Sequence, residues 1–234
     1  MSRLILLHGF TQTGRSWAPL LPAFEAAGLD VEAPDIPAGG DLWATARQLT
    51  VDRGSGAWLG YSMGGRLALH VALAAPQLVD RLVLVGATAG IVDPIDRATR
   101  RETDEAEAAR LERVGVDQFL EHWLAQPLFA ALSEEAAGLE ARRENTVERL
   151  AAHLRMLGTG TQEPLWSRLS ELAMPVLVVA GGRDAKFAAL GERMAAAIGD
   201  NASLALVPGA GHACHLERPA EFATLVTPFL AVTA

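Results

Sequence analysis

The sequence predicts a doubly wound α/β fold, with a mostly parallel sheet of about six strands and an inserted helical lid. Two observations predict the sheet: short apolar runs bounded by glycine, proline or aspartate recur along the chain, and helix-like segments lie between most of them. A third observation predicts the lid, because the alternation stops once, after the fourth run. With 234 residues and 50% hydrophobic side chains, the chain is long enough for one large core.

The apolar runs are short and continuous, which is typical of parallel strands that are buried on both faces. We expect these strands at residues 4–7, 29–33, 57–59, 82–85, 176–180 and 204–207. Between them, helical spacing predicts helices at 17–27, 42–51, 65–75, 190–198 and 220–230. Asp41 is expected to cap the second of these helices.

The segment 93–166 contains no strand signal and is rich in alanine and charged residues. Helical periodicity is found at 99–113 and 145–157, and the mixed charges there predict faces that are exposed to water. We therefore expect an α/β core at 1–90 and 167–234, with a helical lid inserted at 91–166.

Charge and composition exclude several classes of partner. The formal net charge of −8 argues against binding to nucleic acid or to an anionic membrane, so any anion site should be small and enclosed. Cys214 is the only cysteine, so no intramolecular disulfide can form. The apolar run before His8 is too short for a signal peptide, and no stretch approaches a membrane span. We expect a cytoplasmic protein.

The pattern Gly60-Tyr61-Ser62-Met63-Gly64 lies between a predicted strand and a predicted helix. A serine on such a sharp turn takes a strained backbone conformation, which exposes its hydroxyl at the edge of the sheet. The glycines on either side allow the strand and the helix to approach closely. This nucleophile elbow makes the chain a candidate enzyme, with Ser62 as its reactive group.

A serine hydroxyl needs a histidine to take its proton and a carboxylate to orient that histidine. Asp184 follows the predicted strand 176–180, and His212 follows the strand that ends at 207. Because parallel strands place their carboxyl ends at one edge of a sheet, both should meet Ser62 there. The chain order Ser62, Asp184, His212 is typical of this kind of elbow.

Other residues compete for these roles or lie close to them. Asp35 and Asp200 also lie near strand ends or turns, but neither follows a late strand as Asp184 does. We expect His215 to line the site or to support it from behind, and His8 to hold the loop after the first strand. The remaining candidates, His70 and His153, lie in helical patterns and should be structural or solvated.

Two further features of the site would stabilise negative charge. The backbone N–H groups of Phe10 and Met63 are expected to form an oxyanion hole, that is, a pair of fixed donors for a developing negative charge on oxygen. Arg66 lies one helical turn after Ser62, at the helix end where the dipole disfavours a cation. A guanidinium there is suited to bind a substrate carboxylate, although pairing with a nearby side-chain carboxylate is the plain alternative.

These residues resemble a known superfamily and, within it, one branch. Leu7-His8-Gly9-Phe10, the elbow and the strand-end Asp and His resemble the α/β-hydrolase superfamily over essentially the whole chain. Several longer segments resemble those of the 2-succinyl-6-hydroxy-2,4-cyclohexadiene-1-carboxylate synthases of menaquinone biosynthesis. They are the elbow extended to Arg66, Gly182-Arg183-Asp184-Ala185-Lys186-Phe187, Gly158-Thr159-Gly160-Thr161-Gln162, Trp123 with Pro127-Leu128-Phe129, and Gly211-His212.

The resemblance implies a lyase that eliminates pyruvate from 2-succinyl-5-enolpyruvyl-6-hydroxy-3-cyclohexene-1-carboxylate, without metal or organic cofactor. Ser62, activated by His212 and Asp184, would remove a ring proton. The resemblance also implies that three arginines and two aromatic residues, each matched to the family pattern one at a time, contact the substrate. They are Arg66, Arg100, Arg143, Tyr61 and Trp123.

The chain also departs from the family pattern. The segment 86–91 lacks a proline usual after the fourth core strand, 35–40 lacks the usual Gly-His-Gly, and we expect the opening hairpin to be missing. These departures bear on the substrate more than on the three catalytic candidates. Two alternatives therefore remain: a serine hydrolase acting on a small ester or a carbon–carbon bond, and a non-catalytic binding protein that uses the lidded pocket as a receptor.

Overall fold

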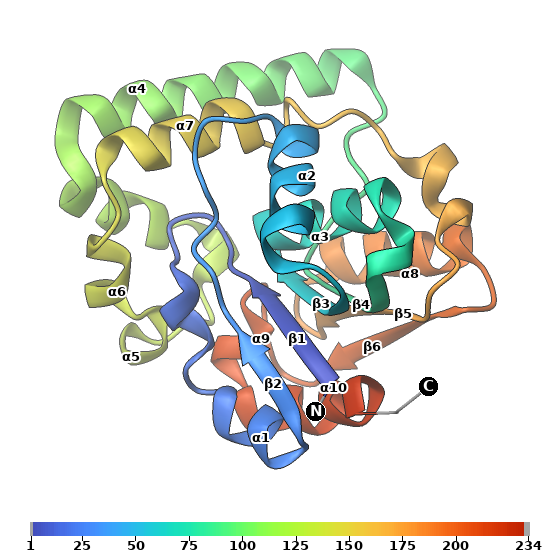
Figure 1. Ribbon diagram of the computed structural model, residues 1–234. Helices are drawn as coiled ribbons and strands as arrows, with labels where there is room; N and C mark the ends of the chain where they lie inside the picture. Colours follow the sequence, from blue (N-terminus) through green and yellow to red (C-terminus); the bar gives the residue numbers. More distant parts are fainter. Residues whose placement is uncertain (1, 232–234) are drawn as a thin grey trace.

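The computed structural model describes residues 2–231 and contains one parallel sheet of six strands (Figure 1). The strand order is β2-β1-β3-β4-β5-β6, and every neighbouring pair is parallel. This confirms the doubly wound sheet predicted from the sequence. The strands are β1 (Ser2–Leu7), β2 (Leu29–Glu32), β3 (Gly56–Tyr61), β4 (Val79–Val85), β5 (Val176–Gly181) and β6 (Ala202–Val207).

Helices cover both faces of the sheet, which explains why the inner strands are apolar without alternation. Ile5 and Trp58 belong to one core cluster, whereas their neighbours Leu6 and Leu59 belong to another. The first cluster lies under α2 (Leu42–Arg53), α3 (Met63–Ala74) and α8 (Ala185–Ile198). The second lies under α1 (Leu21–Ala26), α9 (Cys214–Glu217) and α10 (Pro219–Ala231) (Figure 1).

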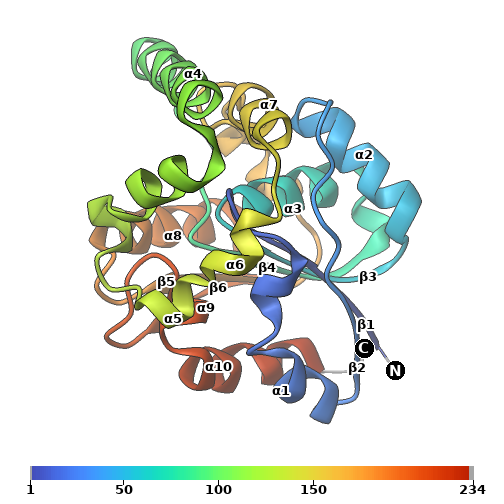
Figure 2. The same cartoon turned by 90° about the vertical axis from the view of Figure 1, so that its left-hand side faces the viewer.

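The segment between β4 and β5 is helical and lies over the end of the sheet where Ser62 is found (Figures 1 and 2). The long helix α4 lies beside α7, and these two helices share a small apolar cluster that includes Leu111, Phe119 and Leu154. Gly115 has a φ of 77°, and α4 bends there. The elements are α4 (Pro94–Leu124), η3 (Pro127–Phe129), α5 (Glu134–Ala137), α6 (Leu139–Arg143) and α7 (Val147–Leu157), followed by η4 (Trp166–Glu171).

Two helices of the core begin several residues away from where the sequence predicted. The helix predicted at 17–27 is a short 3-10 helix, η1 (Gly14–Trp17), followed by α1, because Pro19 and Pro22 lack the amide hydrogen that a continuous helix would need. Helix α8 begins five residues earlier than predicted. The Asp184 side chain accepts a hydrogen bond from the Phe187 N–H at 3.2 Å and so caps this helix. Across residues 2–231, no helix has the length and apolar character needed to cross a membrane.

Candidate active site

Ser62 lies on a strained turn between β3 and α3. Its φ is 52°, in the left-handed region that residues other than glycine rarely adopt. The turn is held by a hydrogen bond of 2.8 Å from the Ser62 N–H to the Val85 carbonyl on β4. Gly64 permits the close approach of α3 to β1, because a Cβ there would lie 2.1 Å from the Leu7 carbonyl oxygen. The local geometry is therefore that of a nucleophile elbow.

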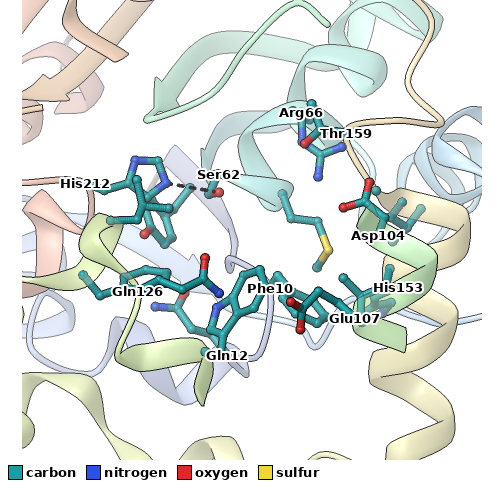
Figure 3. Close-up of a pocket in the computed structure, with 18 of the residues that line it drawn as sticks. Phe10, Gln12, Ser62, Arg66, Asp104, Glu107, Gln126, His153, Thr159 and His212 are labelled. Carbon is teal, nitrogen blue, oxygen red and sulfur yellow. Dashed lines mark hydrogen bonds between the residues drawn. The ribbon is translucent and has the colours of Figure 1, made fainter. Parts of the chain in front are cut away.

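Asp184, His212 and Ser62 meet at the carboxyl ends of β5, β6 and β3. The His212 Nδ1 lies 2.9 Å from Asp184 Oδ2. The His212 Nε2 lies 3.4 Å from Ser62 Oγ (Figure 3). A carboxylate only accepts hydrogen bonds, so Nδ1 carries the proton and Nε2 faces the hydroxyl as an acceptor. The separation of 3.4 Å is long, as is common for such pairs before a substrate is bound.

The carboxyl of Asp184 stays ionised next to the imidazole. Partial burial alone would raise the pKa of Asp184, but the hydrogen bonds from His212 and from the Phe187 N–H outweigh that effect and lower it below its ordinary value. The Phe187 ring packs against the His212 ring at a centroid distance of 4.4 Å. The imidazole is therefore held both by a charged acceptor and by an aromatic neighbour.

The competing carboxylates lie elsewhere. Asp35 accepts a hydrogen bond from the Gly14 N–H at 2.8 Å and pairs with Arg149, and Asp200 is exposed in the turn before β6. His8 holds the loop after β1, as expected: its Nδ1–H donates to the Gly9 carbonyl, and its Nε2 accepts from the Ile36 N–H at 3.0 Å.

A cavity of about 270 Å³ opens in front of Ser62 and His212, between the sheet edge and the lid (Figure 3). Both residues expected to form the oxyanion hole, Phe10 and Met63, line this cavity. Met63 is the first residue of α3, where an N–H has no acceptor within the helix, and Phe10 lies in the loop after β1. The cavity contains the cationic side chains Arg66, Arg100, Arg142 and Lys186 and the acidic side chains Asp104 and Glu107.

Arg66 is the most unusual charged residue of the cavity. It is only 7% exposed, forms no ion pair within residues 2–231, and its Nη1 has no hydrogen-bond partner. Burial, and then the nearby charge of Arg100, lower the pKa of Arg66 to about 10, while Asp104 acts in the opposite direction. The side chain remains charged at neutral pH. A buried guanidinium without a carboxylate partner is suited to bind an anion.

Within the lid, Asp104 connects α4 to the loop that follows α7. Its Oδ1 accepts a hydrogen bond from Arg100 Nε at 2.7 Å, and its Oδ2 accepts one from the Gly160 N–H at 3.1 Å. A Cβ at Gly158 would lie 2.5 Å from Asp104 Oδ2, so the glycine lets this loop approach the carboxylate. The close approach of this loop explains why glycines occur in the Gly158-Thr159-Gly160 segment. The hydrogen bond from Arg100 holds that side chain at the cavity wall, and the Asp104 carboxylate faces Arg66 (Figure 3).

The structure places Arg143 outside the cavity and its neighbour Arg142 inside it. Arg143 is exposed, donates to Asp117 at 2.8 Å and does not line the cavity, whereas Arg142 is 2% exposed and lines it. Successive residues of a helix point about 100° apart, so only one of two adjacent arginines can face inward. Arg142 donates to the Ala137 carbonyl at 2.6 Å and to the Thr11 hydroxyl. Burial lowers the pKa of Arg142 to about 10, although its proximity to Tyr61 acts to raise it.

The expected aromatic residues both line the cavity. The Tyr61 ring lies 5.4 Å from that of His212 and 4.3 Å from that of His215, which supports the site from behind. Burial raises the pKa of Tyr61, so its phenol stays neutral. Trp123, from the end of α4, packs edge-on against Phe10 at 4.9 Å. Aromatic packing thus connects the lid to the loop that carries the expected oxyanion-hole amide.

Sequence reasoning did not select several polar residues of the cavity. Gln12 accepts a hydrogen bond from the Gly9 N–H at 2.8 Å, and Gln126, which follows α4 in the lid, lines the cavity on the side of His212 (Figure 3). No periodic or motif signal marks either glutamine, since each belongs to a loop or to the end of a helix. Other polar lining residues that were not selected are Thr103, Asp104, Glu107, His153, Thr159 and Lys186.

Comparisons with known proteins agree in fold and in sequence. A family model described as the alpha/beta hydrolase family matches residues 4–225. A protein of Serratia proteamaculans (strain 568) named 2-succinyl-6-hydroxy-2,4-cyclohexadiene-1-carboxylate synthase is 31% identical over 97% of this chain and 92% of its own length.

Two solved structures are similar over nearly the whole chain. MenH from S. aureus has a TM-score of 0.91 and 30% identity, covering 98% of this chain and 93% of that one. A thermophilic esterase from Thermogutta terrifontis, described as malate bound, has a TM-score of 0.84 and 22% identity, covering 98% and 89%. The likeness to the esterase concerns the fold alone.

Proposed function

Since this chain belongs to the α/β-hydrolase family, we propose that it is a lyase of that family, which eliminates pyruvate from 2-succinyl-5-enolpyruvyl-6-hydroxy-3-cyclohexene-1-carboxylate. The product is 2-succinyl-6-hydroxy-2,4-cyclohexadiene-1-carboxylate, an intermediate of menaquinone biosynthesis. The name of the Serratia relative supports this substrate, as does a cavity in which a buried, unpaired arginine lies close to a serine.

In this proposal Ser62 is the base. His212 Nε2 takes the hydroxyl proton while Asp184 holds the proton on Nδ1, and the serine oxygen removes a proton from the substrate ring. The electrons of that C–H bond form one ring double bond, the existing ring double bond shifts by one position, and the bond from carbon to the enolpyruvyl oxygen breaks. The departing enolpyruvate takes a proton and becomes pyruvate. No covalent acyl-enzyme is needed.

Negative charge develops on a substrate carbonyl oxygen during proton removal. We assign its stabilisation to the backbone N–H groups of Phe10 and Met63, which border the same cavity as Ser62. Met63 opens α3, so the partial positive charge at the helix N-terminus adds to that of its amide. Loss of one donor of an oxyanion hole commonly raises the barrier by about 2.7 to 4 kcal/mol.

The substrate carboxylates require cations, and the cavity supplies them in a protein that is acidic overall. We assign carboxylate binding to Arg66, Arg100 and Arg142, each of which lines the cavity. Tyr61 and Trp123 would form the apolar wall against the ring. The net charge of −8 would then be offset locally by inward-facing guanidinium groups.

One observation supports the proposal above all: a serine within 3.4 Å of a carboxylate-held histidine shares its cavity with a buried arginine that has no ion-pair partner within residues 2–231. The test is release of pyruvate from the enolpyruvyl precursor by the purified protein, followed with lactate dehydrogenase. Ser62→Ala is the matched control.

A serine hydrolase acting on a small carboxylated ester is the second candidate. The strained Ser62 at the N-terminus of α3 would suit acyl transfer equally well. A screen of p-nitrophenyl esters beside the pyruvate assay separates the two candidates. Rapid ester turnover without release of pyruvate would favour the hydrolase.

A further inference from the structure

The two backbone amides on either side of His212 share one acceptor. The Gly211 N–H donates to Glu217 Oε2 at 2.5 Å, and the Ala213 N–H donates to Glu217 Oε1 at 3.0 Å. The Glu217 N–H in turn donates to the Ala213 carbonyl at 2.9 Å. The Glu217 carboxylate therefore binds the backbone both just before and just after His212.

Each partner in this arrangement is fixed. Gly211 and Ala213 are buried, and an amide without an acceptor in such a place is costly. The Gly211 carbonyl packs against the end of β5, where a Cβ on Gly181 would lie only 2.0 Å from its oxygen. The His212 backbone is thus held by the sheet on one side and by Glu217 on the other.

We propose that Glu217 is a positioning residue, which fixes the His212 backbone so that Nε2 stays within reach of Ser62 Oγ. Contacts with Asp184 and Phe187 set the ring orientation, but they do not fix the position of the chain that carries the ring. The Nε2 to Oγ distance is already 3.4 Å, so a small movement of the loop would break the pair. Only the effect on pyruvate release depends on the function proposed above.

The geometry calls for a carboxylate rather than an amide. Both oxygens of Glu217 accept from a backbone N–H. A glutamine has one acceptor oxygen, and its NH₂ group would face the other backbone donor. Glu217→Gln therefore removes one of the two hydrogen bonds and places two donors against each other, while the size of the side chain is kept.

The experiment compares Glu217→Gln with Glu221→Gln, an exposed glutamate of the next helix that pairs only with Arg218 in the structure. We expect Glu217→Gln to lower kcat for pyruvate release by about tenfold or more, with KM within about twofold of the wild type. Glu221→Gln should leave both constants unchanged. Circular dichroism would confirm that each variant is folded, and Glu217→Asp, which keeps two acceptor oxygens, should show a smaller loss.

Two readouts do not depend on the natural substrate. The rate at which a fluorophosphonate labels Ser62 reports activation of the serine by His212, and a downfield ¹H resonance reports the His212 proton shared with Asp184. We expect Glu217→Gln to slow labelling and to shift or broaden that resonance. If the wild type releases no pyruvate but these two effects appear, the proposed function fails and the role of Glu217 stands. If folded Glu217→Gln is labelled at the wild-type rate and its resonance is unchanged, the proposed role of Glu217 is overturned.

Discussion

The Arg66 N–H donates a hydrogen bond to the Ser62 carbonyl at 3.0 Å, which fixes the cation one helical turn from the reactive hydroxyl. The spacing between the proposed base Ser62 and the proposed anion site Arg66 is therefore a property of α3, whereas Arg100 and Arg142 belong to the lid. A substrate carboxylate on Arg66 can be positioned before the lid contributes. The strain at Ser62 and the burial of Arg66 arise from the same turn.

Removal of the Arg66 guanidinium should weaken catalysis on carboxylated substrates. We expect Arg66→Ala to reduce kcat/KM by about 10- to 100-fold, because hydrogen bonds to charged groups contribute about 1.5 to 3 kcal/mol. Steady-state kinetics on the precursor and on an uncharged p-nitrophenyl ester would measure the effect. An equal loss on both substrates would indicate that Arg66 has a structural role instead.

The adjacent arginines of α6 should differ sharply. Arg142→Ala should raise KM for the carboxylated substrate, since this buried side chain lines the cavity. Arg143→Ala should change kcat and KM by less than about twofold, because an exposed ion pair contributes little. Arg143 is thus a matched control one residue away. The reverse order of effects would show that α6 has a different register when substrate is bound.

Buried His8 should make the protein sensitive to mild acid. Burial lowers the pKa of His8 to about 4, and protonation would end the hydrogen bond that Nε2 accepts from Ile36. Since the pKa is lower in the folded than in the unfolded state, the folded state binds fewer protons. The associated stability is present above about pH 6.5 and is lost as the pH falls toward 4.

Urea unfolding at several pH values would test this expectation. The wild-type free energy of unfolding should fall between pH 6.5 and 4, and His8→Gln should show a smaller change over that interval. Identical pH dependence in both proteins would mean that His8 does not carry this effect. His153 and His70, whose pKa values are also lowered to about 4 by burial, should account for part of the slope that remains.

The parts of the site that sequence reasoning located follow from local rules. The glycines of the elbow and the residues at strand ends are marked by local sequence patterns, so Ser62, Asp184 and His212 could be placed at one edge of the sheet from the sequence. Their chemical roles remain proposals. The strands and most helices follow from apolar runs and periodicity in the same way.

The parts that were missed depend on tertiary packing. Helix α6 has five residues, too few for periodicity to decide between Arg142 and Arg143, and only contact with Thr11 selects the inner one. Glu217 looks like an ordinary exposed helix residue in the sequence. Its role comes from how the chain turns after His212, which no local pattern encodes.

Release of pyruvate from the enolpyruvyl precursor tests the central claim most directly. We predict that the wild type forms pyruvate and the cyclohexadiene product in equal amounts, and that Ser62→Ala lowers kcat by about 10² to 10⁴-fold, the range expected for loss of a general base, while remaining folded. Near-wild-type turnover by folded Ser62→Ala, or no pyruvate from the wild type, would contradict the account.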